Sequence, residues 1–165
     1  MLRSLAIQTL IFFLAFQGLS LLRETSMLST DVELATENNL VTSNISTLMG
    51  KTVSLASQDK TTIIYFFAPW CQVCHVSIGN LQALYEKNDH LDVIAVVLDY
   101  TSIEEVTNFT TRHQLTFPVA LGSEAIKHAF SISGYPSYYV INEENIIIGK
   151  SMGYSSELGL YLRSL

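Results

Sequence analysis

Residues 61–75, TTIIYFFAPWCQVCH, decide the fold of this chain. The run Thr61–Phe67 is rich in isoleucine and aromatic residues, which predicts a strand buried inside a sheet. A short turn follows, and a helix is expected to begin at Cys71. Since Cys71 and Cys74 are the only two cysteines and stand three positions apart, we expect them to form a redox pair in the first turn of that helix.

A helix start favours a reactive sulfur at Cys71. The first turn of a helix offers backbone N–H groups without intrahelical partners and the positive end of the helix dipole. Both stabilise a thiolate, which is the form of cysteine that attacks disulfides. A static structural disulfide is one alternative to a redox pair. A Cu(I) site is the other, but it needs a third ligand, and His75 is expected to point to solvent while the remaining histidines are far away in the sequence.

The rest of the chain alternates strands and helices. Strands are expected at 52–56, 91–98, 118–121, 137–141 and 146–150, and helices at 71–88, 102–113, 123–130 and from 155 or 156 to 165. This order predicts an α/β sandwich with a mixed sheet. The side chains assigned to its core are Phe66, Phe67, Val96, Val97, Phe117 and Val140.

The N-terminal segment is apolar and uncharged between Arg3 and Arg23. As a helix, residues 4–22 would be about 28 Å long, close to the thickness of the bilayer hydrocarbon core. A cleaved signal peptide and an uncleaved signal anchor both fit, and the lack of an Ala-x-Ala cleavage site favours the anchor. The expected organisation is a signal anchor or signal peptide at 1–23, a polar linker at 24–46 and a folded domain at 47–165.

The net charge and the N-terminal segment restrict the classes of partner that the protein is expected to have. The net charge is −6, and the nine basic residues are scattered rather than clustered, which argues against nucleic acid as a partner. Both a signal peptide and a signal anchor imply that the domain is exported. In an oxidising compartment an isolated Cys-x-x-Cys pair needs a dedicated electron partner.

Two motifs resemble a known superfamily. The stretch Phe67–Cys74, FAPWCQVC, resembles the active-site loop of the thioredoxin superfamily, and residues 134–136, GYP, resemble its cis-proline loop. The exported form and the lead-in strand after Gly50 resemble the membrane-anchored TlpA/ResA branch and the related copper-suppressor ScsD-like proteins. The resemblance covers residues 47–165. It implies a thioredoxin-like three-layer sandwich with a mixed central sheet flanked by helices, preceded by one N-terminal transmembrane or signal helix.

The resemblance also implies roles for individual residues. Cys71 would be the exposed nucleophile that forms a mixed disulfide with the partner, and Cys74 would resolve it. Pro136, as a cis proline, would lie beside the Cys71 sulfur, where the backbone at Tyr135 pairs with an extended substrate segment. Trp70 would cover one side of the disulfide.

Two positions depart from the pattern of these families. Tyr65 stands six positions before Cys71, where many thioredoxins bury an acidic residue. Ser77 stands three positions after Cys74, where the TlpA/ResA branch often carries a glutamate. Neither usual proton acceptor for the resolving thiol is present, which argues against fast reductase activity.

These features predict an exported thiol–disulfide oxidoreductase that acts on cysteine pairs of partner proteins. We expect a reductant, fed by a membrane electron-transfer partner and held in a bacterial inner membrane with its domain in the periplasm. No nucleotide or metal cofactor is implied, because the disulfide itself carries two electrons. The alternatives are a disulfide-donating oxidase and a copper-binding thioredoxin-like carrier.

Overall fold

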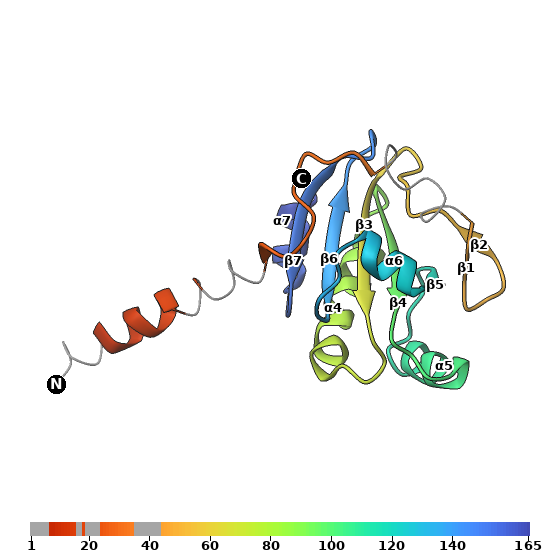
Figure 1. Ribbon diagram of the computed structural model, residues 1–165, viewed down its shortest axis with the longest axis horizontal. Helices are drawn as coiled ribbons and strands as arrows, with labels where there is room; N and C mark the ends of the chain where they lie inside the picture. Colours follow the sequence, from red (N-terminus) through yellow and green to blue (C-terminus); the bar gives the residue numbers. More distant parts are fainter. Residues whose placement is uncertain (1–6, 16–17, 19–23, 35–43) are drawn as a thin grey trace.

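The computed structural model describes residues 7–15, 18, 24–34 and 44–165. Its centre is a five-stranded sheet with the order β5-β4-β3-β6-β7 (Figure 1). β3, β4 and β5 are parallel, whereas β6 is antiparallel to β3 and β7 is antiparallel to β6. The bounds are β3 Thr61–Phe67, β4 Leu91–Val97, β5 Val119–Leu121, β6 Ser137–Ile141 and β7 Ile147–Met152.

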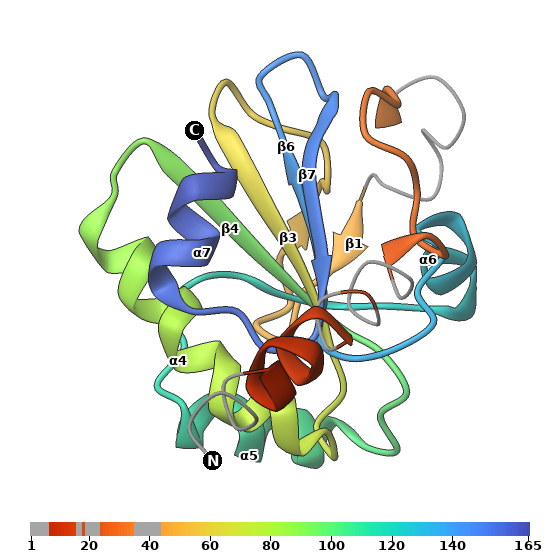
Figure 2. The ribbon, with the colours of Figure 1, turned by 90° about the vertical axis from the view of Figure 1, so that its left-hand side faces the viewer.

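Helices cover both faces of the sheet (Figure 2). α4 (Gln72–Lys87), α5 (Ile103–Arg112) and α7 (Glu157–Arg163) pack on one face, and α6 (Glu124–Ala129) packs on the other. The expected mixed sheet flanked by helices is therefore confirmed. Each of these four helices begins after a side chain that accepts a hydrogen bond from a backbone N–H of the first turn. These N-cap residues are Cys71, Ser102, Ser123 and Ser156.

The central strand β3 separates two hydrophobic cores. Tyr65 and Phe67 face the core under α4, α5 and α7, which also contains both cysteines. Ile64 and Phe66 face the core under α6. Because helices cover both faces, β3 lacks the polar alternation of a half-exposed strand. The predicted core is confirmed, since Phe66, Phe67, Val96, Val97, Phe117 and Val140 are all buried.

A short hairpin lies ahead of the sheet. β1 (Ile45–Ser46) pairs with β2 (Thr52–Val53) in antiparallel register, and the Thr47–Ala120 bridge attaches the hairpin to β5. The sequence predicts a longer strand at 52–56 and none at 45–46. The difference is physical, because a two-residue strand is too short to show a hydrophobic period.

The N-terminal region is described only in part. Residues 7–15 are helical (Figure 1). Their apolar side chains are exposed. The rest of the expected anchor or signal segment at 1–23, apart from residue 18, lies outside the described residues. Within the described residues, no helix has both the length and the apolar character needed to cross a bilayer.

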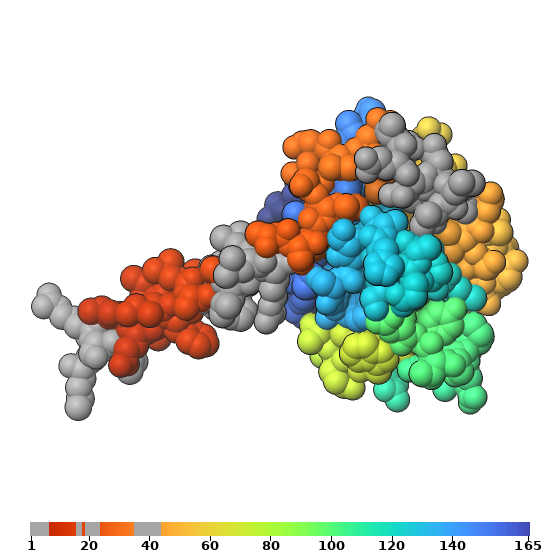
Figure 3. All heavy atoms as spheres, in the orientation of Figure 1, coloured from red at the N-terminus to blue at the C-terminus, as the bar shows by residue number. Residues whose placement is uncertain are grey.

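Residues 24–34, in the stretch expected to be a linker, lie on the surface of the domain along β7 (Figure 3). The Asp31 N–H donates to the Ile147 carbonyl at 2.9 Å, and the Ile147 N–H donates to the Val32 carbonyl at 3.1 Å. Met27 and Leu34 are buried in the core under α6. Backbone hydrogen bonds and two apolar side chains therefore hold this segment against the sheet.

Candidate active site

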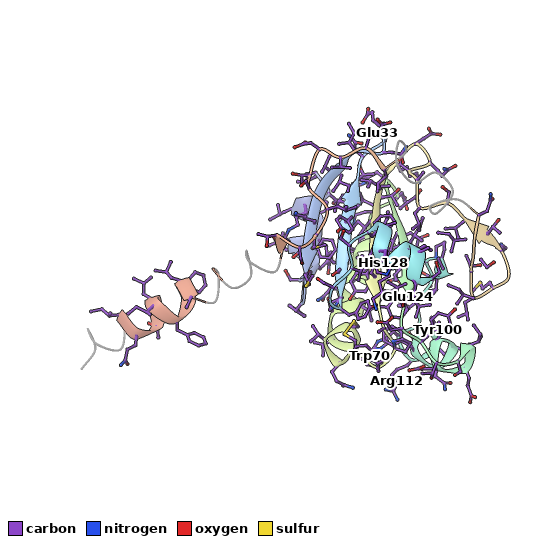
Figure 4. The ribbon with its side chains drawn as sticks, viewed as in Figure 1. Glu33, Trp70, Tyr100, Arg112, Glu124 and His128 are labelled. Carbon is purple, nitrogen blue, oxygen red and sulfur yellow. A yellow bond between two sulfur atoms is a disulfide. The ribbon has the colours of Figure 1, made fainter. Side chains whose placement is uncertain are left out.

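Cys71 and Cys74 form a disulfide where β3 leads into α4. Their Cα atoms lie 5.2 Å apart. The disulfide lies at the end of the domain that carries Trp70, far from Glu33 at the other end (Figure 4). The predicted Cys-x-x-Cys pair is thus present as a disulfide at a helix start.

The two cysteines differ in their surroundings. The expectation that Cys71 is exposed is wrong for this disulfide form, since Cys71 is only 6% exposed, while Cys74 is 0% exposed. The backbone N–H of Cys74 donates to the Cys71 sulfur at 3.1 Å. An N–H donor at the positive end of a helix stabilises negative charge on the sulfur that accepts it. The local structure therefore favours Cys71 over Cys74 as the thiolate that meets a partner.

Asp99 connects three segments around the disulfide. The Trp70 indole N–H donates to the Asp99 backbone carbonyl at 3.0 Å. The Tyr135 hydroxyl donates to the Asp99 carboxylate at 3.0 Å, and the Lys127 ammonium donates to both carboxylate oxygens at 2.8 and 2.7 Å. The Trp70 and Tyr135 rings meet edge to face with centroids 5.8 Å apart. Asp99 thus holds the aromatic side chains of the active-site loop and the proline loop against each other.

Asp99 and Lys127 each stabilise the charged form of the other. The hydrogen bond from Lys127 holds the pKa of Asp99 below its usual value, and the Asp99 carboxylate raises the pKa of Lys127. Burial, reinforced by the Asp99 carboxylate, raises the pKa of Tyr135. Tyr135 therefore keeps its proton and remains a donor to Asp99. Sequence reasoning missed Asp99, although an acidic residue directly after a buried parallel strand is a usable signal for the sheet edge where sites form.

The proline loop lies next to the active-site loop because of strand register. Ser137 of β6 pairs with Phe66 of β3, so Pro136 stands opposite the end of β3. The peptide bond between Tyr135 and Pro136 is cis, the isomer that the sequence analysis expects. The sheet therefore brings the two motifs together from positions more than sixty residues apart in the chain.

A surface hollow of about 540 Å³ lies beside the disulfide. Val73 of α4, Tyr135 of the proline loop and Tyr154 are among the residues that line it. Val73 and Tyr154 are both exposed, as is Trp70 nearby. The structure thus brings all five predicted site residues to one end of the domain, next to an open hollow of mixed polar and apolar lining. These residues are Trp70, Cys71, Cys74, Tyr135 and Pro136.

The expectation that His75 points to solvent is wrong. Its Nε2 lies 2.9 Å from the Pro69 carbonyl oxygen, and its Nδ1 lies 2.7 Å from Nε2 of His113. Because a carbonyl only accepts, Nε2 of His75 carries a proton and donates to Pro69, while the donor of the hydrogen bond between His75 and His113 depends on the tautomers of the two rings. Phe109 packs against both rings. No sequence pattern predicts this pair, since His113 follows a different helix, α5.

No group of three or more potential metal ligands was found among the described residues. The sequence Cys-x-x-Cys-His is also the attachment motif of c-type haem. Here both sulfurs are buried in a disulfide, and His75 is engaged by Pro69 and His113. In this oxidised form neither sulfur is a free thiol, which a covalent bond to haem would require.

The His75–His113 pair predicts a pH dependence of stability. Burial, together with the charges on His75 and Arg112, lowers the pKa of His113. The unfolded chain therefore binds a proton near pH 6.5 that the folded protein resists, so stability falls as the pH drops below about 6.5. We expect His113→Gln to lose less stability than the wild type between about pH 7.5 and about pH 5, as measured by denaturant unfolding.

The matched control is His128→Gln, because the His128 side chain is 86% exposed. That variant should keep the wild-type pH dependence. Measurement above about pH 5 keeps the protonation of Asp99, whose pKa is already lowered, out of the comparison. Equal pH dependence in the wild type and the His113 variant would contradict the prediction.

A buried strand that leads into a Cys-x-x-Cys disulfide at a helix start, next to a proline loop that precedes the adjacent strand, defines a thioredoxin-like protein. Comparison with known proteins agrees with this class. The chain belongs to the AhpC/TSA family, which matches residues 33–150. The resemblance to the thioredoxin superfamily is therefore confirmed.

Individual relatives point to the same group. The chain is 28% identical over 110 residues to the thioredoxin-like protein YneN of Bacillus subtilis, an alignment that covers 63% of this chain and 64% of YneN. It is 32% identical over 94 residues to the thiol-disulfide oxidoreductase ResA of Oceanobacillus iheyensis, covering 54% of this chain and 48% of ResA. The chain thus spans less than two thirds of either curated relative.

The solved structures show the fold. The crystal structure of StoA from Bacillus subtilis matches with a TM-score of 0.66 at 23% identity, covering 73% of this chain and 94% of StoA. At this identity the match carries the architecture alone. The chemistry has to be argued from the residues of this chain.

Proposed function

We propose that this protein is a thiol–disulfide oxidoreductase that exchanges electrons with cysteine pairs of partner proteins through Cys71 and Cys74. The observation that carries the proposal is the disulfide at the start of α4, with an N–H donor on the Cys71 sulfur and an open surface hollow beside it. Similarity to relatives named thioredoxin-like protein and thiol-disulfide oxidoreductase supports it.

The exchange proceeds in two steps when the pair is reduced. The Cys71 thiolate attacks one sulfur of a partner disulfide, which breaks and releases one partner thiolate. The Cys74 thiol then loses its proton and attacks the Cys71 sulfur, which breaks the mixed disulfide and releases the second partner sulfur. Two electrons pass to the partner, and the Cys71–Cys74 disulfide forms again.

The hollow beside the disulfide is the proposed substrate groove. An extended segment of the partner pairs with the backbone at Tyr135, while Trp70 and Pro136 flank the disulfide. Val73 and Tyr154 offer apolar contacts to side chains next to the partner cysteine. Asp99 keeps the walls of the groove in place through its bonds to Trp70 and Tyr135.

We propose that the pair acts as a reductant in an exported domain. In this proposal residues 1–23 hold the protein in a bacterial inner membrane, and a membrane electron-transfer partner reduces the disulfide, so no further cofactor is needed. The reduction potential of the pair tests the direction. A value well below about −220 mV supports a reductant, and a value near about −120 mV makes the protein a disulfide donor instead.

Trapping tests the proposal most directly. Cys74→Ser should accumulate mixed disulfides between Cys71 and partner proteins, because the attacking sulfur is kept while the resolving sulfur is lost. The measurement is non-reducing electrophoresis of the variant isolated from cells after acid quenching, with reduction releasing the adducts. The control is the Cys71→Ser, Cys74→Ser double variant, which has no sulfur to form an adduct. Absence of adducts together with tight Cu(I) binding by the reduced protein would favour a carrier.

A further inference from the structure

Within the described part of the chain, the Tyr65 hydroxyl is the one buried side-chain polar atom found without a hydrogen-bond partner. Tyr65 is fully buried in the centre of β3. Burying a hydroxyl without a partner is costly, so native structures rarely keep one. A phenylalanine would fill nearly the same space at that position without this cost. We therefore infer that the Tyr65 hydroxyl has a hydrogen-bond partner in another state of the protein.

The disulfide that is broken and formed in the redox cycle lies in the same buried cluster as Tyr65. Tyr65, Cys71 and Cys74 belong to the same buried cluster, between β3 and α4. Ser77 follows Cys74 by one helical turn on the buried face of α4. The Ser77 hydroxyl is near enough to act on the pKa of Tyr65, although the two groups do not meet the geometry of a hydrogen bond. Tyr65 thus presents its hydroxyl to the helix turn that follows Cys74.

We propose that the Tyr65 hydroxyl, aided by that of Ser77, donates a hydrogen bond to the Cys74 sulfur when the disulfide is reduced. The inference deepens the proposed function and rests on it, since it requires that the pair cycles between two redox states. A disulfide sulfur is a weak acceptor. Reduction frees the Cys74 sulfur from the S–S bond, and that sulfur becomes a charged, strong acceptor when Cys74 loses its proton in the resolving step. The hydroxyl that is unpaired in the oxidised protein therefore gains its partner on reduction.

Ser77 has the capacity for this second contact. Its oxygen accepts the backbone N–H of Ser155 at 3.3 Å, which leaves the hydroxyl hydrogen to donate elsewhere. Ser77 is itself fully buried. Two hydroxyls on one side of Cys74 replace the single acidic side chain that is usual in the superfamily.

A tyrosine at this position stabilises charge but does not take up a proton. Burial raises the pKa of Tyr65, while Ser77 lowers it and Tyr138 raises it to a smaller extent. Tyr65 therefore keeps its proton at neutral pH and acts as a donor. In the resolving step the proton of Cys74 ends on the partner thiolate that leaves, as the Cys71–Cys74 bond forms and the Cys71–partner bond breaks. The step needs no reactant beyond the mixed disulfide.

The test is the equilibrium of the full chain with reduced and oxidised glutathione. Tyr65→Phe removes the donor from the reduced state and an unpaired hydroxyl from the oxidised state. Both effects favour the disulfide, and we expect the equilibrium constant to shift towards it by about tenfold, equivalent to about 30 mV. The rate at which Cys74 resolves a mixed disulfide with a small thiol should fall in the same variant.

Tyr138→Phe is the matched control. Tyr138 pairs with Tyr65 across β6 and β3 and is fully buried. Its hydroxyl is already bonded to the Ser155 hydroxyl at 3.1 Å. That bond is made in the oxidised protein, and we expect it in both redox states. The control should lower stability while leaving the glutathione equilibrium within about twofold of the wild type.

Unfolding of the oxidised proteins separates a redox role from a structural one. Oxidised Tyr65→Phe should be at least as stable as the wild type, because no hydrogen bond is lost. An unchanged glutathione equilibrium in Tyr65→Phe, or an equal shift in Tyr138→Phe, would overturn the proposal. If Tyr65→Phe does not fold, Ser77→Ala replaces it, with a shift in the same direction expected.

The outcome is independent of partner capture. The glutathione equilibrium needs no protein substrate, so a shift in Tyr65→Phe supports the inference even if the Cys74→Ser variant traps no partner. That combination would support the effect of Tyr65 on the redox equilibrium of Cys71 and Cys74. It would contradict the proposal that the substrates are cysteine pairs of partner proteins. The reverse combination, trapped partners with an unshifted equilibrium, would retain the function and reject the role of Tyr65.

Discussion

Phe66→Ala should lower the free energy of unfolding by about 3–5 kcal/mol. Phe66 is fully buried near the end of the central strand β3 and packs against Phe130 and Tyr139, with ring centroids 4.9 and 6.3 Å away. Loss of the ring leaves a cavity between a central strand and α6 that rigid neighbours fill only in part. Denaturant unfolding of the oxidised protein gives the change.

A substitution on β7 provides the matched control. Ile148 is 40% exposed, so Ile148→Ala removes a large apolar side chain without leaving an internal cavity, and should cost less than about 1 kcal/mol. Equal losses in the two variants would mean that Phe66 does not hold the core under α6. Phe66 also faces away from the disulfide, so its replacement should leave the glutathione equilibrium of the folded protein unchanged.

This contrast between neighbouring residues shows what a strand pattern can predict. The run Thr61–Phe67 is apolar without interruption, which identifies a strand covered on both faces. Local signals also placed the helix starts, because Ser102 and Ser156 supply side-chain caps. Burial alone did not reveal that Tyr65 lacks a hydrogen-bond partner, since that fact depends on every group packed around it.

The site residues that stand in short sequence motifs could be predicted. Those brought together by folding from distant segments could not. Cys71, Cys74 and Pro136 stand in short motifs whose local structure is encoded nearby. Asp99 and His113 contribute from other segments, and their partners are set by strand order and helix packing. Such contacts leave no periodicity in a single sequence, so the clusters around the disulfide required the structure.

The expected difference between the two cysteines is the sharpest prediction for the site. Cys71→Ser should abolish exchange, reducing the rate to that of the uncatalysed reaction, because a serine hydroxyl without an adjacent base is a poor nucleophile. Cys74 is fully buried and should not replace it. The measurement is the rate at which the reduced protein, in stoichiometric amounts, reduces a peptide disulfide.

Cys74→Ser is the control for this variant. It should still attack the peptide disulfide once, forming a mixed disulfide, since Cys71 keeps the N-cap position at the start of α4. Exchange retained by Cys71→Ser and lost in Cys74→Ser would reverse the assigned roles. Both variants remove the same cross-link and so lose the same stabilisation from it. A difference in their first reaction therefore reports on the position of each sulfur at the helix start rather than on the loss of the disulfide.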